Sequence, residues 1–344
     1  MKAAFALAIV TVCATAVAGA SAETYPNFDV YRVDARGHLT DLTPNPALDT
    51  SPSPSPDGSR IAFVSSRSGS PEIYAMSASG GAPVRLTTSP FEDQAVAWND
   101  AGKTSIAWSP DGKRIAFDVQ NATFPPTCQT NCVTWSVYIV NADGTGLHSI
   151  ATEARAPSWS RDGRVLAYED LVTPYGESLG ITLDFINGTR IRVRAFNADS
   201  SFGPRWSPRR DELVFQANGS VYTVRRDGSG RHRLTRGLNP TWSPDGTALA
   251  FVRGGAVLRM TRIGMRIKRI AVAGKTAALP AWSPGGRAVA VLAMPATGSV
   301  QLAVVPSGGG RLQRLTAATR FDTGPFWLGR TGSLVVAACR SCPS

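Results

Sequence analysis

The chain has few lysines for its 344 residues, and arginine carries almost all of its net charge of +11. Lysine occurs only at positions 2, 103, 113, 268 and 275. Nucleic-acid binders concentrate such charge in a run or along one helix face with interleaved aromatic residues. Here it is spread over the chain, with one modest cluster at Arg259, Arg262, Arg266, Lys268 and Arg269. This distribution argues against nucleic acid and predicts a solvated basic surface with affinity for acidic polymers or anionic membrane surfaces.

Histidine is scarcer still, with His38, His148 and His232 as the only copies. Each falls just after a glycine turn, in a similar place within a different repeat. A catalytic triad or a histidine-rich metal site needs its members to converge, and these positions predict separation instead. We therefore expect no metal, no cofactor and no catalytic residue among them.

One nominal nucleophile elbow occurs at residues 176–180, which read Gly-Glu-Ser-Leu-Gly. A functional elbow lies between a strand and a helix. Here the motif runs into the strand-like segment Ile181–Phe185, so Ser178 is not expected to be catalytic.

Long apolar runs are absent after residue 22, which excludes a later membrane span. Residues 1–22 read as a signal peptide, with Lys2, the apolar run Ala3–Ala18 and a small-residue cleavage site ending at Ala22. The mature chain, residues 23–344, is then expected to be a single exported domain, periplasmic or extracellular.

Four cysteines follow the signal peptide, in two close pairs, Cys128 with Cys132 and Cys339 with Cys342. In an oxidising compartment such spacing predicts two local disulfides. A four-thiolate zinc site and a redox role for the second pair remain alternatives.

One motif recurs along the chain and organises it. It reads Trp-Ser-Pro-Asp-Gly, then Ile/Leu-Ala-Phe/Tyr after two residues, in its best copies. Its seven copies begin at Pro54, Trp108, Trp159, Trp206, Trp242, Trp282 and Trp327. The spacing of 36 to 54 residues brackets the ~40–45 residues of propeller repeats. Pro-Asp-Gly favours a tight turn between two short strands, and the pattern of short apolar runs separated by Gly and Pro indicates an all-β fold.

A second repeated half lies between these motifs and predicts another hairpin. It reads Val-Tyr-x-Val-x-x-Asp-Gly, as at residues 137–144. The mature chain opens with a second half at residues 30–43 and closes with a first half at residues 325–338. Seven halves of each kind predict a seven-bladed β-propeller of four-stranded antiparallel blades, closed when the N-terminal hairpin completes the last blade. The weak copy between Trp159 and Trp206 leaves six blades plus an irregular region as the alternative.

Together the two halves resemble the repeat of TolB-type (WD-like) β-propellers over residues 28–338. The resemblance implies the propeller fold and, as for TolB itself, a periplasmic location and docking to a peptidoglycan-associated lipoprotein. Similar propellers occur as gates of prolyl-oligopeptidase-type peptidases and in seven-bladed pectate-fragment lyases, whose metal site is rich in histidine. Because unrelated proteins share such blades, the resemblance is specific for fold rather than for function.

The expected binding site is one mouth of the central channel. In propellers the innermost strand of each blade leads into the Trp motif, so residues just before that strand surround the mouth. Counting five residues back from the motif places Asp322, Asp49 and Lys103 in neighbouring blades. Arg155 and Arg205 lie close to the same strand in the third and fourth repeats. Such a polar arc would suit a peptide, a glycan fragment or a cation held by the two aspartates.

We therefore expect an exported, monomeric propeller that docks a protein, peptide or glycan of the cell envelope at one face and the channel mouth, without catalysis of its own. The alternative is a secreted hydrolase or lyase with its active site in the channel, and a structural envelope protein is a third. Perturbed pKa values clustered at the mouth would favour the enzyme, and a dry apolar patch on one face would favour a protein partner.

Overall fold

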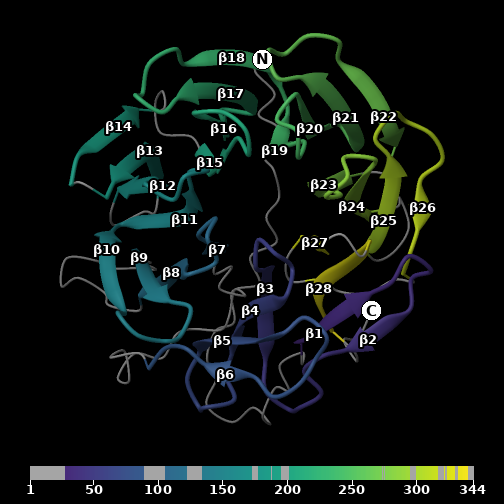
Figure 1. Ribbon diagram of the computed structural model, residues 1–344. Helices are drawn as coiled ribbons and strands as arrows, with labels where there is room; N and C mark the ends of the chain where they lie inside the picture. Colours follow the sequence, from purple (N-terminus) through teal and green to yellow (C-terminus); the bar gives the residue numbers. More distant parts are fainter. Residues whose placement is uncertain are drawn as a thin grey trace, which may run out of the picture.

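The computed structural model describes residues 28–88, 105–121, 134–172, 177–186, 188–194, 201–272, 274, 276–294, 300–316, 321, 324–329 and 332–339. Its strands form seven antiparallel sheets of four strands, arranged as blades around the centre of a ring (Figure 1). The predicted seven-bladed propeller is thereby confirmed. The six-bladed alternative is wrong, because the blade between Trp159 and Trp206 has all four strands.

Blades are numbered 1 to 7 from the one that contains β3. The innermost strands, in blade order, are β3 (Asp49–Pro54), β7 (Ile106–Trp108), β11 (Ala154–Trp159), β15 (Ser201–Trp206), β19 (Leu238–Trp242), β23 (Thr276–Trp282) and β27 (Phe326–Leu328). The second strands are β4 (Arg60–Ser65), β8 (Arg114–Asn121), β12 (Val165–Val172), β16 (Glu212–Ala217), β20 (Ala248–Arg253), β24 (Ala288–Met294) and β28 (Ser333–Cys339). The third strands are β5 (Glu72–Ser77), β9 (Thr134–Asn141), β13 (Glu177–Phe185), β17 (Ser220–Arg225), β21 (Ala256–Thr261), β25 (Gln301–Pro306) and β1 (Phe28–Val33). The outermost strands are β6 (Val84–Arg85), β10 (His148–Thr152), β14 (Arg190–Arg194), β18 (His232–Arg236), β22 (Lys268–Val272), β26 (Gln313–Arg314) and β2 (Leu39–Asp41).

The ring is closed by the N-terminal hairpin, as the order of the repeat halves predicts. Blade 7 has the strand order β2-β1-β28-β27, so its two outer strands come from the start of the described chain and its two inner strands from the end. β1 and β28 pair from Phe28 opposite Cys339 to Val33 opposite Leu334. This pairing leaves no unpaired edge between the first and last parts of the ring.

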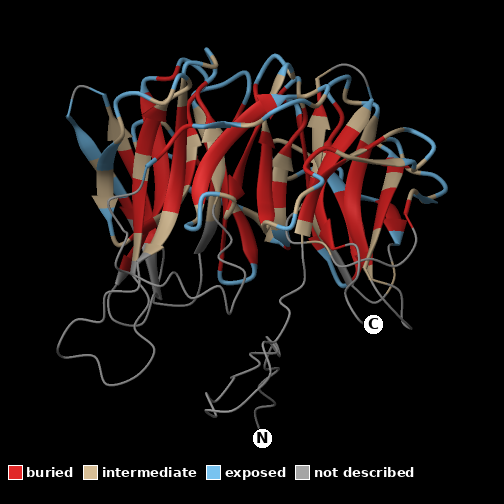
Figure 2. Ribbon diagram, turned by 90° about the horizontal axis from the view of Figure 1, so that it is seen from below, coloured by how far each residue is buried: buried red, intermediate tan, exposed pale blue. Residues whose placement is uncertain are grey.

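In five blades the tryptophan of the motif joins the blade to the one before it. The indoles of the five motif tryptophans from Trp108 to Trp282 are buried, and the strands around them form a nearly continuous buried layer (Figure 2). Five indole Nε1 atoms donate to the carbonyl of the residue that precedes the motif position in the preceding blade. These pairs are Trp108 to Ser53, Trp159 to Ala107, Trp242 to Arg205, Trp282 to Thr241 and Trp327 to Ala281. These tryptophans therefore pack between neighbouring blades.

The Ser-Pro-Asp-Gly turn is stabilised by its serine and aspartate. In blade 5 the Ser243 hydroxyl donates to Asp245 at 2.5 Å and accepts the Ala248 amide N–H at 2.9 Å. Asp245 also accepts the N–H of Thr247 at 3.1 Å. These bonds, the one from Ser243 first, hold the pKa of Asp245 below its usual value. Gly246 adopts a φ of 66°, which the turn requires and glycine tolerates.

We expect Ser243→Ala to lower the free energy of unfolding by about 1–2 kcal/mol, because it leaves the Ala248 amide without a partner and removes one of the hydrogen bonds to Asp245. In blade 6 the equivalent Ser283 accepts the Ala288 N–H at 3.0 Å, but Gly285 replaces the aspartate. The loss in free energy of unfolding should therefore be smaller for Ser283→Ala. Urea unfolding of both variants checks this, and equal losses would contradict the role of the aspartate.

Candidate binding site at the centre of the ring

The innermost strands carry a repeated backbone irregularity near the ring centre. In five blades the strand bulges, and the residue three before the Trp position adopts a positive φ near 50°. These residues are Ser51, Ala156, Gly203, Asn239 and Leu279. Bulges redirect backbone groups away from the sheet ladder. The amide N–H groups of two of them reach the neighbouring blade, that of Ala156 to Asp118 and that of Asn239 to Gln216.

Asp118 is a buried carboxyl group that joins blades 2 and 3. It lies on β8, directly after the apolar Ile-Ala-Phe run, and accepts the amide N–H of Ser105 and of Ala156, each at 2.6 Å. Burial raises its pKa to about 7, against the lowering effect of these bonds and of Arg155. Sequence reasoning missed this group. The sequence feature that could have indicated it is an aspartate at the repeat position where blades 1, 5 and 6 have Val64, Val252 and Leu292.

Arg155, predicted at the channel mouth, is held in an ion pair. Its Nε and Nη2 donate to the two carboxylate oxygens of Glu169 at 2.9 and 3.2 Å, and Glu169 is buried. A bidentate pair of this kind fixes both side chains and leaves the arginine little freedom to bind a ligand. Arg155 and Asp118 therefore belong to one network, linked through the backbone of Ala156.

Asp49 is also paired rather than open to solvent. Its carboxylate is fully buried and accepts Arg67 Nη2 at 3.1 and 3.0 Å and Asn45 Nδ2 at 2.9 Å. The Arg67 guanidinium lies 5.4 Å from the ring centroid of Phe63 and 5.1 Å from that of Tyr74. The loop after β4 thus supplies a counter-ion for Asp49, which was predicted from the sequence as a binding residue at the channel mouth.

Lys103 and Asp322, the other two members of the predicted arc, lie outside the described residues.

The guanidinium of Arg205, unlike the side chains of Asp49 and Arg155, has no hydrogen-bond or ion-pair partner among the described residues. Arg205 directly precedes Trp206 on β15 and pairs with Val214 of β16. Ser201, the residue of this blade counted to the predicted mouth, pairs with Ala217, three positions away along β16. That places Arg205 roughly 10 Å along the strand from the predicted mouth. Its side chain is exposed, and its strand β15 lies at the inner side of blade 4, between the innermost strands β11 and β19 (Figure 1).

The surroundings of Arg205 are nevertheless rich in protein. Desolvation by these surroundings lowers the pKa of its guanidinium, and no carboxylate of the described chain offsets the effect. The equivalent residues of other blades are Ser53, Ala107, Ser158, Thr241, Ala281 and Phe326. Five of these are small, so the arginine extends where most blades leave room. An incompletely hydrated, unpaired guanidinium is a binding group for carboxylates and other planar anions.

The catalytic candidates of the sequence are not supported by the fold. Residues 177–180 belong to strand β13, where Ser178 pairs with Leu171, so the strand–turn–helix context of a nucleophile elbow is absent. The three histidines lie on the outer hairpins of blades 7, 2 and 4. Within the described ranges, no group of three or more His, Cys, Asp or Glu side chains could hold a metal ion, and no helix is long and apolar enough to cross a membrane.

The cysteines are only partly described. Cys339 ends β28 and is buried, whereas Cys128, Cys132 and Cys342 lie outside the described residues.

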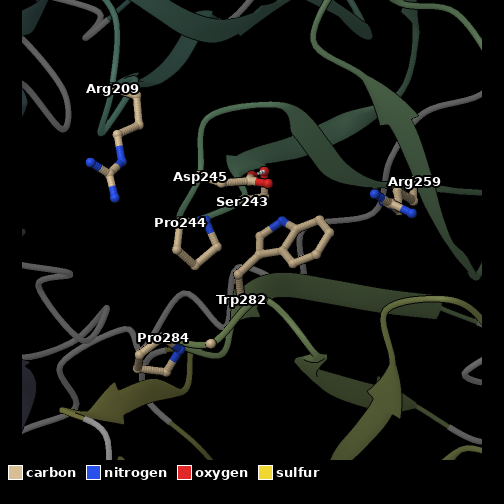
Figure 3. A pocket seen from close by; sticks show the side chains of 9 residues that line it. Arg209, Ser243, Pro244, Asp245, Arg259, Trp282 and Pro284 are labelled. Carbon is tan, nitrogen blue, oxygen red and sulfur yellow. Dashed lines mark hydrogen bonds between the residues drawn. The ribbon is translucent and has the colours of Figure 1, made fainter.

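A small cavity of about 250 Å³ lies on the face that carries the Ser-Pro-Asp-Gly turns, between blades 4, 5 and 6. Figure 3 shows the indole of Trp282 inside it, with Asp245 above and Arg209 and Arg259 on opposite sides. The Arg259 guanidinium lies 5.9 Å from the Trp282 ring centroid. Ligand pockets are typically ~300–1,000 Å³, so this cavity is small for one. Its turn residues and its tryptophan are those that the repeat itself requires.

Comparison with known proteins agrees with this architecture. A family model described as the TolB beta propeller domain matches residues 15–124, about a third of the chain. A putative TolB from Agrobacterium tumefaciens superposes with a TM-score of 0.55 at 17% identity, covering 92% of this chain and 100% of that one. An oligogalacturonate lyase from Vibrio parahaemolyticus gives 0.60 at 12% identity, covering 91% and 97%.

A puromycin-hydrolysing peptidase from Mycobacterium tuberculosis gives a TM-score of 0.63 at 16% identity, covering 84% of this chain but only 52% of its own. The similar structures thus include both a TolB and enzymes. At these identities the likeness establishes the fold alone. The seven closed blades make the chain a seven-bladed β-propeller, and the family match and the repeat make it similar to the TolB beta propeller domain.

Proposed function

We propose that the protein is an exported, non-catalytic binding module that holds an anionic group of a peptide or glycan at the centre of the ring through Arg205. The observation that supports this most directly is the exposed, partly desolvated guanidinium without a partner in the described chain. A carboxylate ligand would restore the solvation that the surroundings of Arg205 remove, and the planar fork would orient it. Loops of several blades around the same axis would contact the rest of the ligand.

The paired state of the other charges supports binding rather than catalysis. Asp49 and Glu169 are buried and paired with Arg67 and Arg155, so neither carboxylate is presented to a substrate at the ring centre. General acid–base catalysis needs a titratable group within reach of the substrate.

A secreted hydrolase or lyase remains the second candidate, and Asp118 is the observation that favours it. Its pKa of about 7 suits a general acid or base near neutral pH. The group is buried, however, and both amide bonds hold it within the blade 2–blade 3 junction.

The test uses calorimetric titration with oligogalacturonate, a neutral cello-oligosaccharide and peptides ending in a free or amidated carboxyl terminus. We expect an anionic probe to bind, and Arg205→Ala to weaken it roughly 10- to 100-fold, the contribution of a hydrogen-bonded charge. Arg210→Ala, an exposed arginine of the turn in the same blade, is the matched control and should leave affinity unchanged.

Loss of affinity in both variants, or in neither, would contradict the proposed role of Arg205. If the protein converts any of these probes and Asp118→Asn abolishes that turnover, the protein is a hydrolase or lyase instead.

Export, a periplasmic or extracellular location, a monomeric state and two local disulfides belong to the same proposal. The ring is closed, so no sheet edge is left between blades 7 and 1 for a second copy to extend. Protein expressed with residues 1–22 and then secreted should begin at Glu23. Its mass should rise on reduction by two hydrogens for each disulfide. A chain that retains residues 1–22 after secretion would contradict the cleavage site.

A further inference from the structure

The net positive charge of the chain is confined to one stretch. Residues 246–321, which supply most of blades 5 and 6, contain no aspartate or glutamate and eleven lysines and arginines. The rest of the chain has 25 basic and 25 acidic residues, so these two blades carry the whole net charge of +11. The expectation of charge spread over all repeats is therefore revised. The exposed cations of the stretch are Arg253, Arg259, Arg266, Lys268, Arg269, Arg287, Arg311 and Arg314.

A common turn closes the outer hairpin of every blade. In each, a glycine N–H donates to the carbonyl oxygen three residues earlier. These glycines are Gly37, Gly80, Gly144, Gly188, Gly228, Gly264 and Gly309. In blade 2, Asp143 precedes the glycine and accepts the N–H of Thr145 at 3.0 Å and its hydroxyl at 2.7 Å. In blade 4, Asp227 accepts the N–H of Ser229 at 2.9 Å. Such short polar residues fit the turn and face water.

Blade 5 departs from this pattern. Ile263 takes the position of the aspartate, and Met265 takes that of the residue after the glycine. Their side chains are 53% and 60% exposed, and Ile267, two residues on, is 41% exposed. None of the other six turns has a large aliphatic residue at either position. Ile263 cannot accept an amide N–H as the aspartate does, and the Met265 N–H donates instead to the Thr261 hydroxyl at 3.1 Å. Neither aliphatic side chain gains burial from its place in the turn.

Arg266 departs from the pattern in a second way. It adopts a φ of 53°, where the equivalent residues of blades 2 and 4 are Gly146 and Gly230 with φ of 69° and 63°. A left-handed conformation is unfavourable for arginine and costless for glycine. Three positions of one turn thus break the local rule without a folding benefit, which is the pattern of a functional site.

The charged residues within this turn and the start of the following strand, residues 261–269, are all basic. Arg262, Lys268 and Arg269 flank the three aliphatic residues. Lys268 donates to the Gly308 carbonyl of blade 6 at 2.6 Å and Arg262 lies 3.5 Å from Glu212 of blade 4, so both are anchored to neighbours. Arg266 and Arg269 are exposed and have no ion pair among the described residues. Residues 261–269 are called the basic hairpin tip below.

We propose that the basic hairpin tip binds the surface of an anionic lipid bilayer. Ile263, Met265 and Ile267 insert at the headgroup level, while Arg266, Arg269 and the basic surface of blades 5 and 6 attract the lipid phosphates. Stable peripheral binding takes two signals, apolar insertion and a basic patch, and this tip has both. A soluble polyanion would use the cations but gain nothing from exposed aliphatic side chains. The inference is independent of Arg205.

The test is flotation of the purified chain with vesicles of equal parts phosphatidylglycerol and phosphatidylcholine, beside vesicles of phosphatidylcholine alone. We expect binding to the anionic vesicles, weakened by salt. Ile263→Asp with Met265→Thr rebuilds the turn of blade 2, so it should fold at least as well and lower partitioning about tenfold or more. Arg266→Gly with Arg269→Gln should lower it by a similar factor.

Matched controls separate insertion from other effects. Ile186→Thr removes a similarly exposed aliphatic residue from the corresponding turn of blade 3 and should leave vesicle binding unchanged. Arg205→Ala, as a separate variant, should also leave it unchanged. Undiminished vesicle binding by Ile263→Asp/Met265→Thr would overturn the inference. So would binding of soluble polyglutamate that is as tight as vesicle binding and is likewise unchanged in that variant. Failure to bind anionic vesicles at all would overturn it as well.

Discussion

A chain that lacks residues 28–41 is expected not to yield a folded monomer. Those residues are β1 and β2, and β1 buries Val30, Tyr31 and Val33 against the last and first parts of the ring. Without them β28 loses its partner along six residue pairs and presents an open edge. Unpaired edges of this length pair with other chains. Size-exclusion chromatography and circular dichroism should show aggregate or a disordered chain.

A point variant tests the same closure without truncation. Val30→Asp places a carboxylate in the core shared by blades 7 and 1 and should lower the free energy of unfolding by several kcal/mol. Arg32→Asp, two residues along the same strand but only partly buried, is its control and should cost about 1 kcal/mol or less. A synthetic peptide of residues 28–44 added to the truncated chain should recover monomer. A truncated chain that is monomeric with an unchanged melting temperature would contradict the role of the hairpin.

The repeat halves made the blade count and the ring closure predictable, because each motif states its own local structure. Trp at the motif position predicts a buried strand, and Ser-Pro-Asp-Gly predicts the turn after it. The same regularity exposes departures, such as Ile263 at a turn position where no other blade has a large aliphatic residue. Those departures became informative only once the hydrogen bonds defined which positions were equivalent.

The site was less predictable, for physical reasons. Ser51, Ala156 and Leu279 adopt left-handed conformations that none of these residue types favours, so no sequence signal marks the bulges. Asp49 was predicted to lie at the channel mouth, but nothing in the sequence pairs it with Arg67, which the short loop after β4 brings into contact with it. Asp118 follows an apolar run and looks like the end of a strand, and only the fold reveals the two amides that it accepts.

Asp118 should make the protein less stable as pH rises from about 4 to about 7. The folded protein retains, up to a pKa of about 7, a proton that the unfolded chain releases near 3.8. Within this window the unfolded state binds fewer protons, so the free energy of unfolding falls with increasing pH and levels off above it. The difference of about three pH units corresponds to a loss on the order of 3–4 kcal/mol.

Urea unfolding between pH 4.5 and 8 measures this slope, and Asp118→Asn should remove it because an amide does not ionise. The variant also places an NH₂ group against one of the two amide donors, of Ser105 or Ala156. Its free energy of unfolding should therefore be lower than that of the native protein at pH 4.5, and the difference should be smaller at pH 8.

Asp143→Asn is the control. Hydrogen bonds from Thr145 lower the pKa of Asp143, so its contribution is lost only as pH falls below about 4. A slope that persists in Asp118→Asn would assign the buried proton to another group. A slope that vanishes would show that the junction of blades 2 and 3 carries a titrating carboxyl group behind the innermost strands.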